Sequence, residues 1–341
     1  YAILMLASAV GPGAWTRLPS VPDRHGFAGS FAGVSGGGLL VAGGANFPDR
    51  RPWEGGKKVW TDAVFVLDRP AGEWRVAGRL PRPMGYGVSV THGDSLVCVG
   101  GSNAAGHSAE AFRLTWADGK LASTPLPPLP KPVANACGTL VGGTLYVVGG
   151  LATPEAASAM NSVYAIDLSA AERRWRSLDP LPGPGRMLAV AAACGDALFV
   201  AGGVELVAGP DGKPRRRYLK DAYRLDPAKG WQRVADLPSA SAAAPSPAPA
   251  DAAGFYVIGG DDGSQVDAKP DGHRGFARTI LRYDMKGDRW TAAGEVPAPR
   301  VTAACVQWGD GWVVPSGEER PGVRSPEVWM WTPPTDHGRK Q

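Results

Sequence analysis

A carboxylate and a guanidinium lie close together in the segment 317–324, which reads Gly-Glu-Glu-Arg-Pro-Gly-Val-Arg. Glu318 can exchange protons with a sugar hydroxyl, and Arg324 can hold a carboxylate through two charge-assisted hydrogen bonds. A second interpretation is an ion pair that only stabilises the loop, because Pro321 and Gly322 shape a turn in either case. Strand-like runs stand on both sides, so we predict a loop at one end of a sheet that carries the chemistry.

The same layout, a β-rich run that ends in a pair of glycines, occurs at five other places. The pairs are Gly43-Gly44, Gly100-Gly101, Gly149-Gly150, Gly202-Gly203 and Gly259-Gly260, and the sixth is Ser316-Gly317. Their spacing of roughly 50 residues is typical of kelch propeller blades. Most pairs are followed by a variable loop, an alternating strand, a Trp strand, Leu-Pro or Val-Pro, and then a small-residue strand that leads to the next pair. Together with the run that ends in the pair, this makes four short strands per unit. We therefore predict an all-β fold, a six-bladed kelch-type β-propeller.

Two units depart from the pattern. The last unit has three strands within residues 302–331 and lacks its Trp strand, whereas residues 14–19 form a Trp strand with no blade of its own. We predict that this N-terminal strand completes the last blade and closes the ring, which removes open sheet edges. The second unit is degenerate, because Trp116 is displaced and the Pro-rich run 125–132 follows it.

The predicted organisation is a single propeller at residues 14–335, with an apolar leader at 1–13 and a polar tail at 336–341. The leader is too short to span a bilayer and resembles the end of a secretory signal peptide. An ordinary apolar edge strand is the alternative. We therefore expect a periplasmic or secreted protein, and we find no other segment that could cross a membrane.

Composition and motifs exclude several classes of function. The chain has 341 residues with 47 Gly and 32 Pro, which indicates many tight turns, and its net charge of +4 is too small to argue for nucleic-acid binding. We find no P-loop, Gly-x-Ser-x-Gly elbow or HExxH motif. Four cysteines lie in apolar runs without metal-ligand spacing, and we interpret them as buried small hydrophobes: Cys98, Cys137, Cys194 and Cys305. We expect neither a metal nor a cofactor.

Three segments resemble the N-acetylneuraminate epimerase (sialic acid mutarotase) family in a cyclically permuted form. They are residues 26–34 leading to 42–47, residues 86–90, and the Gly-Glu-x-x-Pro-Gly-x-Arg loop at 317–324. The resemblance spans nearly all of residues 14–331. It implies a propeller in which Glu318 and Arg324 belong to the loop implicated in the family's activity, and it implies an arginine at the position of Arg186.

In a propeller, the loops after the second strands and the residues before the innermost strands converge at one mouth, which is the default pocket. After the Gly-Gly pairs stand Asn46, Asn103, Glu205 and Asp261, and before the innermost strands stand Arg82, Arg186 and Arg300. We predict that these residues bind the substrate, because arginine recurs in the same register of three blades. Solvated loop tips are the alternative. The insertion at 46–58 is expected either to cover the mouth as a lid, with Trp53 stacked on a sugar, or to be a plain surface loop.

We predict an isomerase that interconverts the α and β anomers of N-acetylneuraminate or a similar nonulosonic acid by general acid–base ring opening and closing. The expected partner is a small sugar acid rather than nucleic acid. The alternatives are a non-catalytic kelch propeller that binds a protein or glycan, and a related sugar-acid isomerase or lyase. A binding module would have an apolar or aromatic patch at the mouth, whereas an enzyme would have convergent charge around a small pocket.

Overall fold

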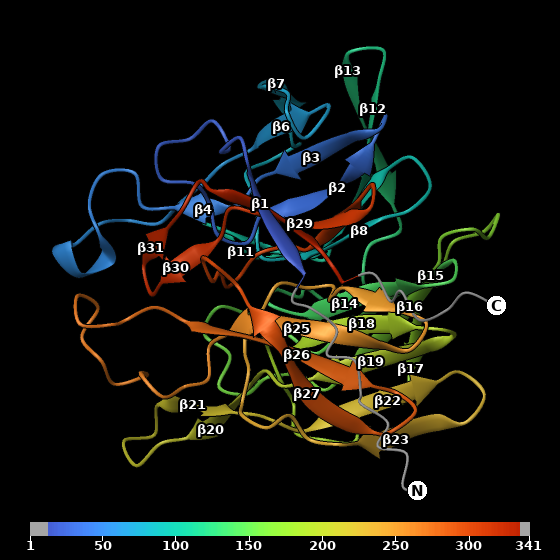
Figure 1. Ribbon diagram of the computed structural model, residues 1–341, viewed down its shortest axis with the longest axis vertical. Coiled ribbons are helices and arrows are strands. Elements are labelled where there is room, and N and C mark those ends of the chain that lie inside the picture. Colours follow the sequence, from blue (N-terminus) through green and yellow to red (C-terminus); the bar gives the residue numbers. More distant parts are fainter. Residues whose placement is uncertain (1–12, 335–341) are drawn as a thin grey trace, which may run out of the picture.

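The chain folds into six four-stranded antiparallel sheets, the blades, around a central axis (Figure 1). A computed structural model describes residues 13–334, and it confirms the predicted six-bladed β-propeller. The predicted leader, apart from Gly13, and the predicted polar tail at 336–341 lie outside the described residues. In the described part of the chain, no helix has the length and apolar character needed to cross a bilayer.

The blades follow one another in the order of the sequence. Blade 1 comprises β2 (Phe31–Ser35), β3 (Gly38–Ala42), β6 (Ala63–Leu67) and β7 (Trp74–Arg79); blade 2 comprises β8 (Val88–Thr91), β9 (Leu96–Val99), β12 (Ala111–Ala117) and β13 (Lys120–Leu126); blade 3 comprises β14 (Cys137–Val141), β15 (Thr144–Val148), β16 (Val163–Asp167) and β17 (Arg176–Leu178). Blade 4 comprises β18 (Val190–Cys194), β19 (Ala197–Ala201), β22 (Ala222–Asp226) and β23 (Gly230–Val234); blade 5 comprises β24 (Ala250–Asp251), β25 (Gly254–Gly260), β26 (Ala277–Asp284) and β27 (Arg289–Glu295); blade 6 comprises β28 (Val306–Trp308), β29 (Gly311–Pro315), β32 (Val328–Thr332) and β1 (Ala14–Leu18).

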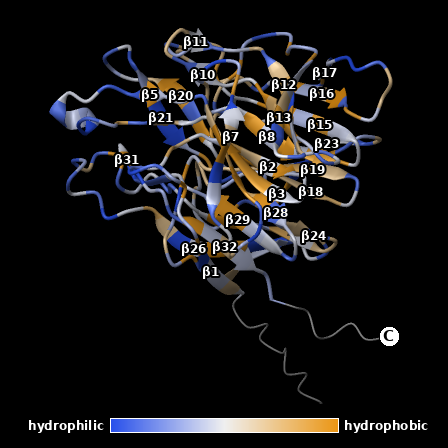
Figure 2. Ribbon diagram, turned by 90° about the horizontal axis from the view of Figure 1, so that it is seen from above, coloured by the Kyte–Doolittle hydropathy of each residue, from blue (hydrophilic) through white to orange (hydrophobic). Residues whose placement is uncertain are grey.

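Four blades carry an additional two-stranded hairpin between their second and third strands. These hairpins are β4 (Ala45–Asn46) with β5 (Val59–Trp60), β10 (Ser102–Asn103) with β11 (Gly106–His107), β20 (Val204–Ala208) with β21 (Pro214–Tyr218), and β30 (Glu318–Arg320) with β31 (Val323–Arg324). The hairpins β20–β21 and β30–β31 lie on the left in Figures 1 and 2. The 3-10 helix η1 (Pro52–Glu54) interrupts the long connection between β4 and β5. All four hairpins contribute to one cavity, as expected for loops that follow the glycine pairs.

The N-terminal strand completes blade 6, as predicted. β1 pairs antiparallel with β32, and Trp15 lies opposite Trp331 in the register. The two indole rings stack with their centroids 6.1 Å apart. Trp331 is fully buried, and its ring meets the edge of Tyr256 from blade 5 at 4.8 Å between centroids. Both ends of the described chain therefore stabilise the same sheet, and that sheet packs on its neighbour through Trp331.

The hydrophobic core is divided among the interfaces between neighbouring blades, and each interface has its own cluster of buried side chains. Figure 2 shows apolar residues in the blade strands and hydrophilic residues in the outlying loops. Tryptophans on the outer side of four blades donate their indole N–H to a carbonyl that follows the preceding blade, at 2.8–3.1 Å: Trp74, Trp175, Trp231 and Trp290. Blades 2 and 6 are the exceptions. In blade 2, as predicted, Trp116 is displaced and lies on the third strand β12, and in blade 6 the indole nitrogen of Trp15 has no hydrogen-bond partner among the described residues.

The glycine pairs end the second strands because two consecutive residues there need positive φ. At Gly202 and Gly203, φ is +63° and +97°, and a Cβ on Gly202 would collide with the carbonyl oxygen of Ser241. Ser316 adopts the same conformation with φ of +62°. Its buried hydroxyl accepts a hydrogen bond from the Phe27 N–H at 2.7 Å, which links blade 6 to the segment before blade 1. This hydrogen bond compensates for the strain that a side chain introduces at this position.

A closed ring of six backbone hydrogen bonds surrounds the propeller axis, and we call it the central ring. One residue from each blade contributes, with φ between +53° and +68°: Gly29, Tyr86, Asn135, Leu188, Ala243 and Thr302. The N–H of each donates to the carbonyl of the preceding member at 2.7–2.8 Å, and Gly29 closes the ring on Thr302. Left-handed backbone is costly for residues with a Cβ, so the closed ring holds five such residues in a conformation they rarely adopt alone.

Replacing Trp331 by alanine is expected to lower the free energy of unfolding by about 3–5 kcal/mol, because it leaves a cavity where the ring of blades closes. Chemical denaturation followed by circular dichroism would measure the loss. Val76→Ala, at a residue 69% exposed on β7, is the control and should change that free energy by less than about 0.5 kcal/mol. Equal effects of the two substitutions would contradict the importance of this contact for ring closure.

Candidate active site

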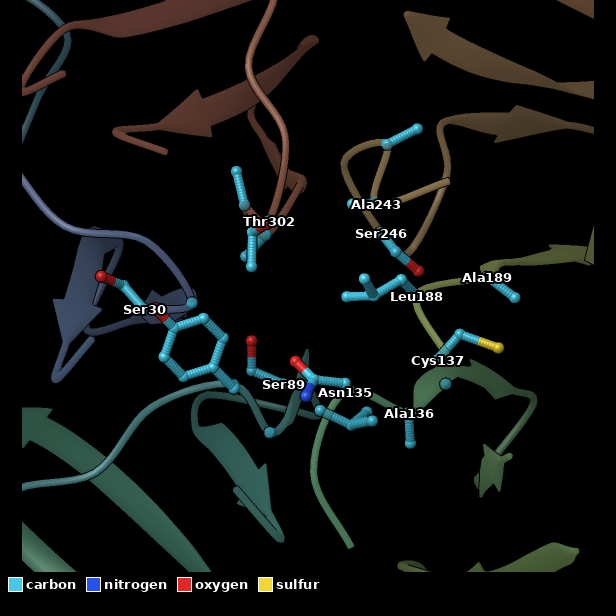
Figure 3. A pocket seen from close by; sticks show the side chains of 18 residues that line it. Ser30, Ser89, Asn135, Ala136, Cys137, Leu188, Ala189, Ala243, Ser246 and Thr302 are labelled. Atoms are coloured by element: carbon cyan, nitrogen blue, oxygen red, sulfur yellow. The ribbon is translucent and has the colours of Figure 1, made fainter. Parts of the chain in front are cut away.

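The hairpins surround a cavity of about 950 Å³ at one mouth of the propeller. Members of the central ring form its floor, and they also line a much smaller space of about 70 Å³ in the channel below. Figure 3 shows Asn135, Leu188, Ala243 and Thr302 around this opening. The central ring therefore narrows the channel, and the cavity above it has the volume of an ordinary small-molecule site.

Glu318 and Arg324 both line the cavity and form an ion pair. They lie opposite each other on β30 and β31, and Arg324 Nη1 donates to Glu318 Oε1 at 2.6 Å. The Gly322 N–H donates to the same oxygen at 2.9 Å. Among residues 13–334, the second oxygen, Oε2, has only a long contact of 3.5 Å with Thr302 Oγ1. Glu318 therefore keeps one carboxylate oxygen that can accept a proton from a ligand in the cavity.

The Arg324 guanidinium is buried and held by groups from other elements. Its Nε donates to the Ala45 carbonyl at 3.4 Å, and Nη2 donates to the Tyr86 hydroxyl at 3.3 Å. The Phe47 ring centroid lies 4.7 Å from its central carbon Cζ. Since arginine has five N–H donors and Glu318 takes a third, two donors remain for a ligand.

Lys58 and Tyr86 complete this charged wall of the cavity. The Lys58 ammonium lies 5.0 Å from the centroid of the Tyr86 ring and 5.5 Å from that of Trp60. Burial lowers the pKa of Lys58, the positive charge of Arg324 lowers it further, and the negative charge of Glu318 opposes both. Burial raises the pKa of the Tyr86 phenol, with Arg324 opposing and Glu318 reinforcing the shift, so this hydroxyl stays protonated at neutral pH.

The remaining walls combine polar and apolar groups. The Tyr218 hydroxyl on β21 donates to Asp261 at 2.8 Å, and burial together with this hydrogen bond raises the pKa of Tyr218 to about 12. His107 on β11 has two buried ring nitrogens without a hydrogen-bond partner among residues 13–334. An apolar cluster also borders the cavity and consists of Leu188, Ala243, Phe276 and Val301. The cavity can therefore contact charged, hydroxylated and apolar parts of one ligand.

The structure places Arg82, Arg186 and Arg300 outside the cavity lining, contrary to the prediction that they converge at the mouth. Each arginine instead pairs with an acidic residue just before the third strand of its own blade. The pairs are Arg82–Glu110 at 2.8 Å, Arg186–Asp221 at 2.8 Å and Arg300–Glu327 at 2.6 Å. Arginine recurs in one register because the repeat has a structural ion pair there, so the recurrence carries no information about a ligand.

Arg186 has the most complete set of partners of the three. Its guanidinium is fully buried, donates to both carboxylate oxygens of Asp221 at 3.0 and 2.8 Å and to the Gly202 carbonyl at 2.9 Å, and stacks on Tyr223. Burial raises the pKa of Asp221, but the hydrogen bonds and charge of Arg186 outweigh it and hold that pKa below its usual value. Arg186 is thus closed to a ligand and stabilises blade 4.

Strand alternation explains why some of the residues predicted after the glycine pairs line the cavity and others do not. Asp261 and Glu318 stand one residue after their pairs and line the cavity, whereas Asn46 and Glu205 stand two residues after and do not. Successive side chains of an extended chain point to opposite sides. Asn103 is also second after its pair, yet it lines the cavity, because the tight turn between β10 and β11 begins directly after it.

The two residues that point away have structural partners. Asn46 is buried and donates to the Gly26 carbonyl at 3.0 Å and to Asp23 at 3.2 Å. Glu205 forms an ion pair with Arg217, its cross-strand neighbour on β21. Both side chains therefore stabilise loops and hairpins at the mouth and do not form part of the cavity lining.

Sequence reasoning missed Trp60, His107 and Tyr218, which all line the cavity. Each lies on the return strand of a hairpin, directly opposite the first residue after a glycine pair, as Arg324 does opposite Glu318. These residues could therefore have been found in the sequence as the cross-strand partners of the first residue after each glycine pair.

The predicted stacking of Trp53 on a ligand does not agree with its position. Trp53 does not line the cavity, and it packs against the turn at Gly322, where a Cβ would lie 3.0 Å from its ring. Lys58, at the end of the same connection, does line the cavity. The insertion at residues 46–58 thus packs against the β30–β31 turn, and Lys58 is the residue that it contributes to the cavity lining.

A family model described as N-acetylneuraminate epimerase matches residues 12–123 and 126–268, which is more than half of the chain. The chain belongs to the N-acetylneuraminate epimerase family. The resemblance seen in the sequence is therefore confirmed at the level of the family, while its cyclic permutation stays a prediction.

Curated members of the family are similar to this chain over a shorter stretch. The N-acetylneuraminate epimerase of Salmonella enteritidis PT4 (strain P125109) is 40% identical over 119 residues, which cover 31% of this chain and 30% of that protein. The one of Yersinia pestis (strain Pestoides F) is 39% identical over 110 residues, covering 29% and 27%. The matched stretch thus spans less than a third of these relatives.

A solved structure titled "Structure of YjhT" superimposes with a TM-score of 0.67 and covers 82% of this chain and 87% of its own. The sequence identity over that superposition is 16%, so this likeness shows the shared fold alone.

The described residues contain no group of three or more His, Cys, Asp and Glu side chains that could hold a metal ion. All four cysteines are free and buried, which confirms their interpretation as small core residues. Burial raises the pKa of Cys137, which lines the channel below the central ring, to about 12. Its thiol is therefore protonated at neutral pH and is a poor nucleophile.

Replacing Arg186 by methionine is expected to lower the free energy of unfolding by about 3–5 kcal/mol at pH 7, because the Asp221 carboxylate stays buried without its partner. The folded-state pKa of Asp221 is depressed in the wild type, so the ion pair stabilises above the usual carboxyl pKa and is lost as the pH falls below about 4. Urea unfolding at pH 7 and at lower pH would show the difference between the proteins shrinking.

Arg174→Met is the matched control, because its ion pair with Glu172 is exposed and should change stability by less than about 1 kcal/mol. A stability difference for Arg186→Met that does not depend on pH would contradict the ion-pair interpretation. Loss of ligand binding by the folded variant would contradict its structural role.

Proposed function

We propose that the protein is an isomerase that interconverts the anomers of N-acetylneuraminate or a similar nonulosonic acid, with Glu318 moving the proton. Membership of the N-acetylneuraminate epimerase family supports an epimerase. The observation that carries the role of Glu318 is its position in the cavity, with one oxygen bound to Arg324 and Gly322 and the other available to a ligand. A substrate of this class has a carboxylate, hydroxyls and an acyl methyl, which match the charged, polar and apolar walls.

The reaction needs only proton transfers. Glu318 Oε2 takes the proton of the anomeric hydroxyl while the bond between the anomeric carbon and the ring oxygen breaks, and the ring oxygen takes a proton from water in the open cavity. The keto group then rotates about its bond to the rest of the open chain, and the hydroxyl formed from the ring oxygen attacks the other face of the carbonyl. The hydroxide left in the cavity takes the proton of that hydroxyl, and Glu318 gives its proton to the carbonyl oxygen, which becomes the new anomeric hydroxyl. Arg324 keeps Glu318 oriented throughout, and its two remaining donors can bind substrate oxygens.

A non-catalytic binding propeller is the second candidate, and the mouth does not favour it. Large exposed apolar side chains are few among the described residues and lie apart in the sequence: Trp53, Val59, Val76 and Val266. Charge instead converges on the cavity at Lys58, Glu318 and Arg324. A related sugar-acid isomerase or lyase would use the same cavity and differs only in substrate. Export to the periplasm or beyond stays a prediction from the apolar residues at the start of the sequence.

Replacing Glu318 by glutamine is expected to slow anomer exchange of N-acetylneuraminate by at least about 100-fold, because the amide cannot accept the proton. Exchange between the two anomers can be followed by NMR magnetisation transfer. Glu319→Gln is the matched control, because this neighbouring carboxylate is 43% exposed and does not line the cavity, so its removal should leave the rate within about twofold.

A wild-type protein that leaves the exchange at the rate of the buffer would exclude this substrate. A Glu318→Gln variant with the full wild-type rate would exclude Glu318 as the proton carrier while leaving the epimerase assignment intact.

A further inference from the structure

The Lys58 ammonium is a cation without a carboxylate partner beside an ion pair that is already neutral. Among residues 13–334 it has no ion pair or hydrogen bond, whereas Arg324 pairs with Glu318 at 2.6 Å. Two cations and one carboxylate give this wall of the cavity a net charge of +1. An anion bound beside Lys58 would balance this charge and stabilise the ammonium.

Two aromatic rings hold this ammonium in position without neutralising it. Tyr86 and Trp60 lie 5.0 and 5.5 Å from Lys58 Nζ, which is the range of cation–π attraction. The Tyr86 ring is fixed in turn, because its backbone belongs to the central ring and its hydroxyl accepts from Arg324. A ring face attracts a cation but takes none of its hydrogen bonds, so all three N–H donors of Lys58 stay available.

The other cations at the mouth are less suited to this task. Arg324 already uses three of its five N–H donors in hydrogen bonds to Glu318, Tyr86 and Ala45. Arg216, on β21, interacts with Tyr218, whose hydroxyl donates to Asp261. Lys58 is held between two aromatic rings, has no hydrogen bond or ion pair among residues 13–334, and lies close enough to Glu318 for their charges to interact.

We infer that Lys58 is the anchor for the substrate carboxylate, a binding role that rests on the proposed function and deepens it. In a 2-keto sugar acid, the carboxylate is bonded to the anomeric carbon. Holding that carboxylate at Lys58 therefore fixes the anomeric centre beside Glu318, and it selects acids over neutral sugars. The long connection that carries Lys58 reaches the cavity lining at this residue, and Trp53 packs the connection against the neighbouring hairpin turn.

The test compares the affinities for N-acetylneuraminate and for its neutral methyl ester, measured by calorimetry on the full chain. The wild type should prefer the acid by about 10- to 100-fold, the range of one charge-assisted hydrogen bond. Lys58→Met should lose that preference through weaker binding of the acid alone, with the ester affinity unchanged within about twofold. Lys58→Arg should restore part of the preference. Lys57→Met is the matched control, since this exposed neighbour does not line the cavity and its removal should keep the preference.

The outcomes separate this inference from the proposed function. A wild-type protein with no preference for the acid overturns the inference whatever its catalytic rate, and so does a Lys58→Met variant that keeps the preference. Equal losses for acid and ester would mean that Lys58 only shapes the cavity, which also overturns it. A wild-type preference that Lys58→Met abolishes supports the inference even if the protein does not accelerate anomer exchange, in which case the proposed reaction fails alone.

Discussion

The central ring is the constraint on which the rest of the structure depends. Six backbone hydrogen bonds form a closed circle, so each bond fixes the geometry of its neighbours, and in blades 1 to 4 the member stands two residues before the innermost strand. The same circle contacts the Glu318–Arg324 ion pair from two directions. Tyr86 of blade 2 accepts a hydrogen bond from Arg324, and Thr302 of blade 6 contacts Glu318. Fold and site therefore share one set of backbone contacts.

The architecture could be predicted from the sequence because its signals are periodic and local. Glycine pairs at a regular spacing indicate strands that end in left-handed backbone, and four of the tryptophans recur because each indole binds the preceding blade. The surplus of Trp15 at one end and the missing strand at the other predicted the closure of blade 6, which the pairing of β1 with β32 confirms. Glu318 and Arg324 were found because both stand in one short loop.

The rest of the site depends on information that spacing alone does not contain. Recurrence of arginine looked like convergence on a ligand, but Arg186 and its counterparts serve ion pairs within their own blades. Asn46 and Glu205 stand at the second position after their glycine pairs, where the side chains of an alternating strand point away from the cavity. His107 and Tyr218 come to the cavity only through cross-strand pairing in hairpins whose lengths differ from blade to blade. These site predictions failed because the register of each strand is defined only by its pairing in three dimensions.

The pairing in blade 6 has a consequence for the order of assembly. This blade contains the first and the last described strands, and its hairpin carries Glu318 and Arg324. During synthesis β1 cannot pair with β32 until β32 has left the ribosome, by which time all strands of blades 1 to 5 have been made. The blade that holds Glu318 and Arg324 is therefore the last of the six to be completed.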